Sequence, residues 1–396
     1  MSQLTTVKLG DICGFQGGSQ PPKSVFIDKP KKGYVRLLQI RDFKSDSKAV
    51  YIPVERAKRF CELDDIMIGR YGASVGQIHR GKEGSYNVAL IKTIPDESQI
   101  HRDYLYWYLL SPEFQLSLSK VAERSAQAGF SKSDIDGFKV FLPPLPEQKR
   151  IVAILDEAFA AIDKAMGNTE KNLANARELF ASQLQSVCTQ CGEGWVDKPF
   201  SELCNIKHGF AFKGEFFTKT GDYVLLTPGN YFETGGYRDR GEKQKFYTGE
   251  IPSDYIMSEG DMLVAMTEQA AGLLGSPLLV PESNKFLHNQ RLGLVTPKSG
   301  VPWTNEFFFH VFNTQQVRRD IHASASGLKV RHTSPKKIGD VVVSFPTSIS
   351  EQNKIVSILA RLRVETERLE SIYQRKLFAL GDLEKSILQE AFSGKL

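Results

Sequence analysis

Apolar residues recur every three or four positions along two long stretches of the chain. The first stretch runs from Ile151 through Leu155, Ala158, Ile162, Met166, Leu173, Ala176, Phe180, Leu184 and Val187. The second runs through Ile355, Leu359, Leu362, Leu369, Tyr373, Leu377, Leu380, Leu383, Ile387 and Ala391. This spacing places the apolar side chains on one face of an α-helix. We therefore predict two helices of about 40 residues, each roughly 60 Å long at ~1.5 Å per residue.

Helices of this length, with a narrow apolar seam and charged flanks, need a partner helix. The simplest partner of each is the other, which predicts an antiparallel coiled coil within the chain. The proline-rich residues 143–146 stop a strand and lead into the first helix, and Ser350 is a candidate N-cap of the second. Gly167 and Gly381 each cost their helix about 1 kcal/mol.

The chain is a tandem duplication. Residues 147–155, EQKRIVAIL, return at 351–359 as EQNKIVSIL, and the period of 351 − 147 = 204 residues is too long for a solenoid repeat. Further matches are residues 9–13 with 200–204, 65–68 with 261–264, and 103–109 with 306–312. The offset grows from 200 − 9 = 191 to 204, which indicates loop insertions in the second copy. We expect a pseudo-twofold molecule.

Each half should hold one mixed α/β domain followed by a long helix. Short β-branched runs such as residues 34–38 and 341–343 alternate with glycine-rich and charged loops. The predicted parts are a globular domain at 1–146, a helix at 147–192, a second domain at 193–346 and a final helix at 347–396. Aromatic clusters at 104–108 and 307–312 could stack on bases, but their helical spacing and matching positions favour the core.

Length and charge narrow the class of protein. At 396 residues the chain can hold two or three domains. No apolar run reaches the roughly 18 to 20 residues of a membrane span, and the N-terminus lacks a signal-peptide core, so we expect a cytoplasmic protein. Residues 1–146 carry 21 Lys and Arg against 16 Asp and Glu, whereas 197–350 carry 17 against 16. The excess in the first half is compatible with nucleic-acid binding.

Five cysteines, an odd number, argue for reduced thiols. Cys188, Cys191, Cys204 and His208 have a spacing that would suit tetrahedral zinc. Cys204, however, repeats Cys13, which has no upstream CxxC. We therefore favour packing in the domain framework over a metal site.

The sequence lacks several common catalytic motifs. It contains no GxxxxGK[ST] phosphate loop and no HExxH. It also lacks a (D/N/S)PP(Y/F/W) methyltransferase tetrapeptide and a spaced PD-(D/E)xK nuclease core. These absences favour a non-catalytic binding protein.

The order of parts resembles the specificity subunits of type I restriction-modification systems. Residues 143–163 are similar to the central conserved region of that family. Gly194-Trp195, residues 200–203 and the tail KSILQEAFSGKL are similar to family patterns as well. The second copy departs from the pattern where residues 347–350, TSIS, replace the proline-rich lead-in.

The resemblance implies a DNA-recognition subunit without chemistry of its own. Each globular half would be a target-recognition domain that reads half of a bipartite, gapped DNA site through the major groove. The coiled coil would set the spacing, and its ~60 Å reach is compatible with half-sites roughly 34 to 36 Å apart. Helix starts at 147–150 and 351–354 would dock two methyltransferase subunits. No cofactor is expected on this chain: S-adenosylmethionine belongs to the methyltransferase subunit, and ATP and Mg to the restriction subunit.

Basic and polar residues near the expected loops are the candidate DNA contacts. In the first domain they are Arg36, Arg41, Lys44, Arg70, Tyr71, Ser74, Arg80 and Lys82. In the second they are Arg238, Arg240, Lys243, Lys245, Thr267, Glu268, Gln269, Arg291, Lys329, Arg331 and Lys336. Arg70 has the fork geometry for guanine, and Gly72 and Gly76 would let the backbone approach phosphate.

Two other functions remain open from the sequence. A specificity subunit of a type IIB-like restriction enzyme would have the same architecture, with one partner polypeptide that carries both nuclease and methylase. A coiled-coil scaffold that binds no DNA is the other alternative.

Overall fold

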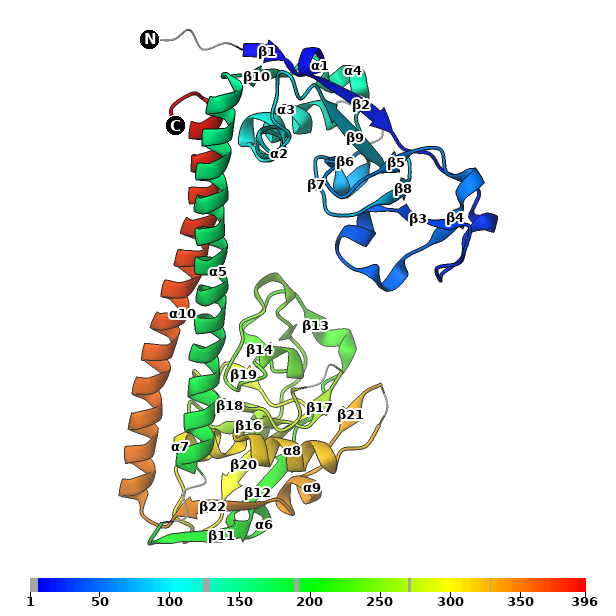
Figure 1. Ribbon diagram of the computed structural model, residues 1–396. Coiled ribbons are helices and arrows are strands. Elements are labelled where there is room, and N and C mark those ends of the chain that lie inside the picture. Colours follow the sequence, from blue (N-terminus) through cyan, green and yellow to red (C-terminus); the bar gives the residue numbers. More distant parts are fainter. Residues whose placement is uncertain (1–5, 124–128, 189–191, 270–271, 328) are drawn as a thin grey trace. The chain divides into compact units, whose positions relative to one another are not determined.

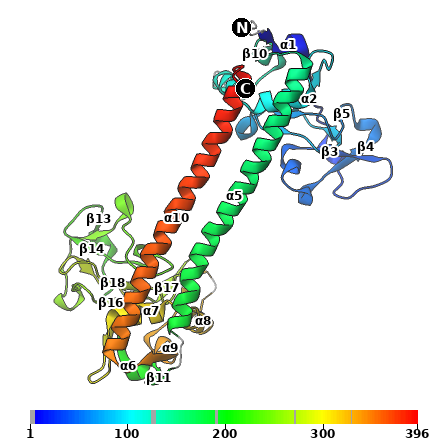
Figure 2. The ribbon, with the colours of Figure 1, turned by 60° about the vertical axis from the view of Figure 1, so that its left-hand side comes forward.

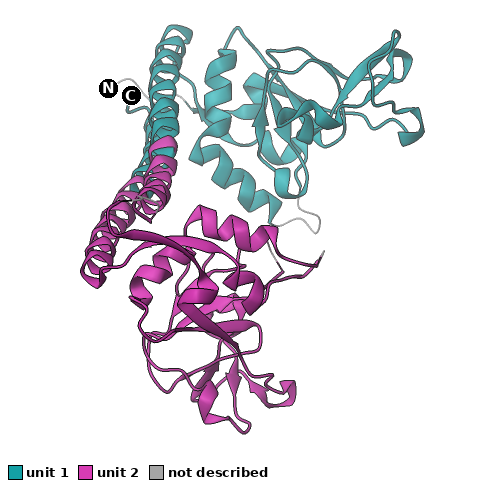
Figure 3. Ribbon diagram, turned by 90° about the horizontal axis from the view of Figure 1, so that it is seen from below, with its two compact units in different colours: residues 1–170, 374–396 teal, residues 171–373 magenta. Residues whose placement is uncertain are grey.

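The chain folds into two compact units in a computed structural model that describes residues 6–123, 129–188, 192–269, 272–327 and 329–396. Unit 1 contains residues 1–170 and 374–396, and unit 2 contains residues 171–373 (Figure 3). Each unit consists of one globular domain and the adjoining parts of two long helices. No helix in the described ranges has the length and apolar character that a membrane span requires.

The two predicted long helices are confirmed as α5 (Leu145–Cys188) and α10 (Ile349–Phe392), of 44 residues each (Figures 1 and 2). In unit 1 the start of α5 and the end of α10 share a core that includes Leu155 and Leu388. In unit 2 the end of α5 and the start of α10 share another core, which includes Leu184 and Leu359. Start meets end in both units, so the predicted antiparallel pairing is confirmed.

The domain of unit 1 contains two four-stranded sheets. The larger, antiparallel sheet has the order β2 (Cys13–Gly17), β9 (Leu90–Pro95), β6 (Met67–Gly69), β7 (Ile78–His79). The smaller has the order β4 (Tyr51–Pro53), β3 (Tyr34–Leu38), β8 (Gly84–Tyr86), β5 (Phe60–Cys61), with β3 parallel to β8. The pair β1 (Thr6–Lys8) and β10 (Lys139–Phe141) leads to α5. The helices are α1 (Leu9–Ile12), α2 (Arg102–Leu110), α3 (Pro112–Ala122) and α4 (Lys132–Ile135).

Unit 2 repeats this order of elements. Its larger sheet is β12 (Cys204–His208), β20 (Leu292–Pro297), β16 (Met262–Ala265), β18 (Pro277–Leu279). Its smaller sheet is β13 (Phe217–Thr218), β15 (Phe246–Tyr247), β14 (Tyr223–Leu225), β19 (Phe286–Leu287), with β14 parallel to β19. Two further pairs are β11 (Trp195–Pro199) with β22 (Val342–Pro346) and β17 (Thr267–Glu268) with β21 (Arg331–His332). The helices are α6 (Phe200–Leu203), α7 (Asn305–Phe312), α8 (Gln315–Ala323) and α9 (Pro335–Gly339).

Single bridges complete the match between the two smaller sheets. In unit 1 a single β-bridge between Ile27 and Tyr51 takes the place of the pairing of β13 with β15 in unit 2. In unit 2 a single β-bridge between Ile256 and Leu287 takes the place of the pairing of β5 with β8 in unit 1. The duplication therefore extends to strand pairing, although two of the pairings are strands in one unit and single bridges in the other.

The aromatic clusters belong to the core, as their helical spacing predicted. On α2 the side chains of Tyr104 and Tyr108 are buried, and their hydroxyls donate to the backbone oxygens of Phe141 and Lys139 on β10. On α7 the side chains of Phe307, Phe308 and Phe312 are buried. These rings hold the strand that precedes each long helix, so they are not available as base-stacking platforms.

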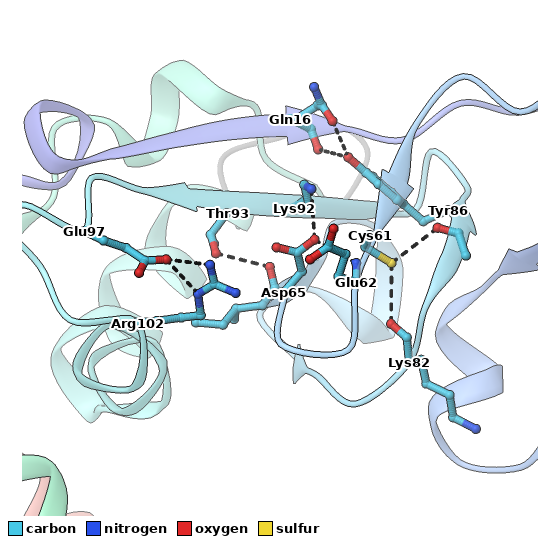
Figure 4. A network of polar contacts seen from close by, with 12 residues as sticks. Gln16, Cys61, Glu62, Asp65, Lys82, Tyr86, Lys92, Thr93, Glu97 and Arg102 are labelled. Atoms are coloured by element: carbon cyan, nitrogen blue, oxygen red, sulfur yellow. Dashed lines mark hydrogen bonds and ion pairs between the residues drawn. The ribbon is translucent and has the colours of Figure 1, made fainter.

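An acidic residue precedes each central strand and has the same local role in both domains. The Asp65 carboxylate accepts from the backbone N–H of Glu62 and from Lys92 Nζ, both at 2.9 Å (Figure 4). The Asp261 carboxylate accepts from the backbone N–H of Ser258 at 2.7 Å. Each carboxylate closes the turn that leads into a buried strand, which explains why the acid is repeated.

The proposed zinc spacing falls partly outside the described residues, since Cys191 is not described. Cys188 and Cys204 are buried in the apolar core of unit 2, and burial raises the pKa of each thiol to about 12. Both thiols therefore belong to the apolar core of this domain.

Candidate nucleic-acid interface

The loop after β6 presents Arg70 and Tyr71 at the edge of the larger sheet in unit 1. Arg70 Nε donates to the backbone oxygen of Phe130 at 2.8 Å, and its guanidinium lies 5.0 Å from the Tyr71 ring centroid. Tyr71 is 43% exposed. A short 3-10 turn, Gly72–Ser74, follows, and Gly72 has φ +58°, a conformation that favours glycine. Arg70 is thus oriented by the fold beside an exposed ring.

The equivalent loop in unit 2 is longer. In unit 1 the N–H of Gly69 donates to the oxygen of Gln77, and the N–H of Gly76 donates to the oxygen of Gly69, so the two hydrogen bonds close a loop of residues 70–75. In unit 2 the N–H of Ala265 donates to the oxygen of Ser276, and the N–H of Gly275 donates to the oxygen of Ala265. These two hydrogen bonds close a loop of residues 266–274. The second loop therefore has three more residues, in keeping with the predicted insertions.

A buried carboxylate organises the end of this longer loop. Glu268 is 2% exposed, and its Oε2 accepts backbone hydrogen bonds from Gly272, Leu273 and Leu274 at 3.0, 2.9 and 3.0 Å. Charge-assisted bonds of this kind are roughly twice as strong as neutral ones. Glu268 therefore stabilises the loop from inside and does not face solvent.

The prediction that residues 267 and 268 offer their side chains to DNA is corrected by their burial. Thr267 is 8% exposed, and its Oγ1 lies 3.2 Å from His332 Nδ1. Both residues belong to β17, which pairs with β21, so their side chains are engaged within the domain. Gln269, the next residue, is exposed.

Three basic residues lie near Glu268: Arg318, His322 and Arg331, the last of which pairs with Glu268 in the register of β17 and β21. Arg318 Nη2 donates to the backbone oxygens of Gly272 and Glu233, and burial lowers the Arg318 pKa to about 10. His322 Nδ1 lies 3.5 Å from Glu268 Oε1, and burial lowers the His322 pKa while Glu268 opposes that shift. Arg331 Nη2 donates to the His322 backbone oxygen at 2.6 Å. Arg331, a predicted DNA contact, thus fastens β21 to α8.

Several predicted contacts in unit 1 are engaged in ion pairs. Arg36 and Lys82 each reach Asp46 Oδ1 at 2.6 Å, and their hydrogen bonds lower the pKa of Asp46 to about 2. Arg80 pairs with Asp103 at 2.9 Å, and its guanidinium lies 3.8 Å from the Tyr106 ring centroid. A phosphate would have to compete with these partners.

The remaining candidates are more accessible. Arg41 and Lys44 are exposed in unit 1 and Ser74 is half-buried. In unit 2 Arg240 is half-buried, and the exposed candidates are Arg238, Lys243, Lys245, Arg291, Lys329 and Lys336. Among the described residues none of these exposed cations forms an ion pair. They are therefore free to attract an anionic partner.

The repeated Glu-Gln signature contains a residue whose role the sequence did not reveal. Gln148 is fully buried, its Oε1 accepts from the His101 backbone N–H at 2.7 Å, and its Nε2 donates to the oxygens of Gln99 and Pro143. Gln352 is also fully buried. Its Oε1 accepts from the Thr304 N–H at 3.0 Å, and its Nε2 donates to the oxygens of Pro302 and Pro346. In each unit this glutamine ties the first turn of a long helix to the globular domain.

The chain belongs to the family described as type I restriction modification DNA specificity domain, whose model matches residues 1–172 and 192–374. The resemblance noted from the sequence is thereby confirmed. The chain is 19% identical over 409 residues to the type I restriction enzyme MjaVIII specificity subunit of Methanocaldococcus jannaschii, covering 98% of this chain and 92% of that protein. It is 26% identical over 229 residues to the EcoBI specificity subunit of Escherichia coli, covering 56% of this chain and 44% of that protein.

Solved structures share the fold. The crystal structure of the HsdS subunit from Thermoanaerobacter tengcongensis matches with a TM-score of 0.62 at 15% identity, covering 99% of this chain and 97% of that one. A chain from a study of complex assembly and conformational transition in a type I R-M system matches with a TM-score of 0.78 at 16% identity, covering 99% and 98%. The predicted architecture of two mixed α/β domains with two long helices is therefore confirmed.

Proposed function

We propose that this chain is the non-catalytic DNA-specificity subunit of a type I restriction-modification complex. Each domain reads one half of a bipartite, gapped DNA site through the major groove. The coiled coil sets the distance between the two readers. The duplication of strand pairing carries this proposal, because two equivalent frameworks with different loops suit a site made of two different halves.

The loops after the central strands support the assignment of sequence reading to the divergent parts. Arg70 and Tyr71 occupy this position in unit 1, and a loop three residues longer, held by Glu268, occupies it in unit 2. Arginine can donate two hydrogen bonds to guanine in the major groove. Unequal loops on equal frameworks are what two different half-sites require.

The starts of the long helices are the proposed docking surfaces for two methyltransferase subunits, which restriction subunits then join. Arg150 forms an ion pair with Glu147 at 2.7 Å, and Arg150 lowers the pKa of that carboxyl. Lys354 and Glu351 form the equivalent pair at 3.8 Å. S-adenosylmethionine is expected on the methyltransferase subunits, and ATP and Mg on the restriction subunits, so this chain needs no cofactor.

A domain exchange tests the proposal. Residues 1–146 are replaced by the corresponding domain of another specificity subunit, and the chain is expressed with its methyltransferase partner. Single-molecule sequencing of the cellular DNA should then show a gapped motif with one half changed and the other retained. Loss of both halves together, with the complex still assembled, would contradict independent reading by the two domains.

A further inference from the structure

The net charge of the first domain is concentrated in its smaller sheet. We define the first lobe as residues 18–62, which include β3, β4 and β5, and the second lobe as residues 209–258, which include β13, β14 and β15. The two lobes begin at equivalent glycines. A Cβ on Gly18 would lie 2.0 Å from the oxygen of Asn87, and a Cβ on Gly209 would lie 2.1 Å from that of Asn289. The lobes are therefore matched parts of the duplicated fold.

The matched lobes differ sharply in charge. The first has 11 Lys and Arg against 5 Asp and Glu, a net charge of +6, which exceeds the +5 of the whole chain. The rest of residues 1–146 has 10 against 11. The second lobe has 6 against 7, a net charge of −1. The segments that lead into β8 and β19, the later strands of the two smaller sheets, each add one cation and one anion. These residues are Lys82 and Glu83 before β8, and Lys285 and Glu282 before β19.

The cations of the first lobe are accessible and carry little internal compensation. Arg36 is the member that pairs within the lobe, with Asp46. The other ten are exposed and form no ion pair with any described residue: Lys23, Lys29, Lys31, Lys32, Arg41, Lys44, Lys48, Arg56, Lys58 and Arg59. Among the acids, Asp42 is buried and accepts the Gln39 N–H, so it forms no surface ion pair with the exposed cations.

These charges are close enough to act together. A compact segment of 45 residues has a radius of gyration of about 9 Å. The Debye length at physiological salt is roughly 8 Å, which is similar to this radius. Neighbouring exposed charges of the lobe are therefore only partly screened from one another, and their electrostatic fields add. In the second lobe Arg238, Asp239, Arg240, Glu242 and Lys243 alternate in sign over six positions, and their fields largely cancel.

We propose that the first lobe is the phosphate-binding grip of this subunit on duplex DNA, and that the second domain binds its half-site with little net electrostatic attraction. The inference rests on the proposed function and adds a division of labour between the two readers. Phosphate contacts position a protein on DNA and make its affinity depend on salt, whereas base contacts specify the sequence. The salt dependence that this subunit contributes should therefore come mainly from its first lobe.

Matched charge removal in the two lobes tests the division. Each variant changes two exposed lysines that have no ion-pair partner among the described residues. The first-lobe variant is Lys29→Gln, Lys58→Gln, and the second-lobe variant is Lys213→Gln, Lys219→Gln. The full chain is used in complex with its methyltransferase subunit. Binding to a fluorescent 30-base-pair duplex without the target site is measured between 50 and 200 mM salt.

Each phosphate contact contributes about 0.9 to the slope of log K against log salt. If both lysines contact phosphate, the first-lobe variant loses about 1.8 of that slope, so between 50 and 200 mM salt its affinity falls about 12-fold less than that of the wild type. The second-lobe variant should retain the wild-type slope. Both variants should still purify with the methyltransferase subunit.

Four results would overturn the inference. Equal slopes for the first-lobe variant and the wild type, or equal losses from both variants, would remove the asymmetry while leaving the proposed function intact. Loss of the methyltransferase subunit from the first-lobe variant would assign the lobe to protein docking. Absence of both DNA binding and methylation by the wild-type complex would instead refute the proposed function, and the inference with it.

Discussion

Replacing Gln148 by leucine should unfasten the first long helix from its domain. The substitution keeps a side chain of similar size but removes the acceptor for the His101 N–H and the donors to the oxygens of Gln99 and Pro143. A buried backbone group left without a partner costs about 1–3 kcal/mol. Some of the three groups can reach water, so we expect a total of about 3–5 kcal/mol, a large part of the ~5–15 kcal/mol of a typical domain.

Amide hydrogen exchange at His101 measures this effect directly. Because 1.4 kcal/mol corresponds to a factor of ten, even 3 kcal/mol would lower the protection of the His101 amide about 100-fold. The Thr304 amide, which Gln352 holds in unit 2, is the internal control and should keep its protection. Gln352→Leu should give the reciprocal result.

A neighbouring exposed residue provides the matched control. Glu147→Gln removes the ion pair with Arg150, and surface pairs of this kind contribute about 0–1 kcal/mol. His101 protection should therefore change by less than about fivefold in this variant. A change below threefold in Gln148→Leu would show that the glutamine is not the fastening group.

Substitutions at four other residues test the described contacts. Glu268→Ala removes the acceptor of three loop N–H groups, so the methylation motif should lose preference in the second half-site and keep it in the first, with partial recovery in Glu268→Gln. Burial lowers the pKa of His310 to about 4, below the ~6.5 of an unfolded histidine, so its contribution to stability is complete above pH 6.5 and is lost as pH falls toward 4. His310→Phe should therefore reduce the loss of unfolding free energy between pH 7 and pH 5 by on the order of 2 kcal/mol, measured by urea titration. Gly209→Ala should destabilise by more than about 3 kcal/mol because its Cβ would overlap a backbone oxygen. Gly381→Ala, in open space on α10, should stabilise by about 0.5–1 kcal/mol in the same titration.

The long helices and the duplicated framework were predictable because their signals are local and repeated. A periodic apolar face over some 40 residues specifies a helix without reference to distant contacts. The run before β6 and the run before β16 each carry an acid that closes a turn, and that acid was visible in both copies. Strand partners were not predictable, because β3 and β8 pair across almost 50 residues.

The loops after the central strands were predictable from the sequence, whereas the environments of their side chains were not. The loop after β6 contains Arg70, whose role in DNA contact stays a prediction. In unit 2, however, neighbouring residues of similar polarity have opposite environments, with Glu268 buried and Gln269 exposed. A short strand, β17, decides between them by pairing with β21, 63 or more residues along the chain.

Gln148 and Gln352 show what the sequence determines about this protein and what only the tertiary structure decides. Sequence alone determined that the pair is repeated, that each lies at the start of a long amphipathic helix, and that the chain consists of two such halves. Only the tertiary structure placed each amide against three backbone groups from a preceding loop and strand. The physical reason is that helical periodicity depends on residues a few positions apart. The burial and hydrogen-bond partners of a polar side chain depend on segments that meet only in the folded chain.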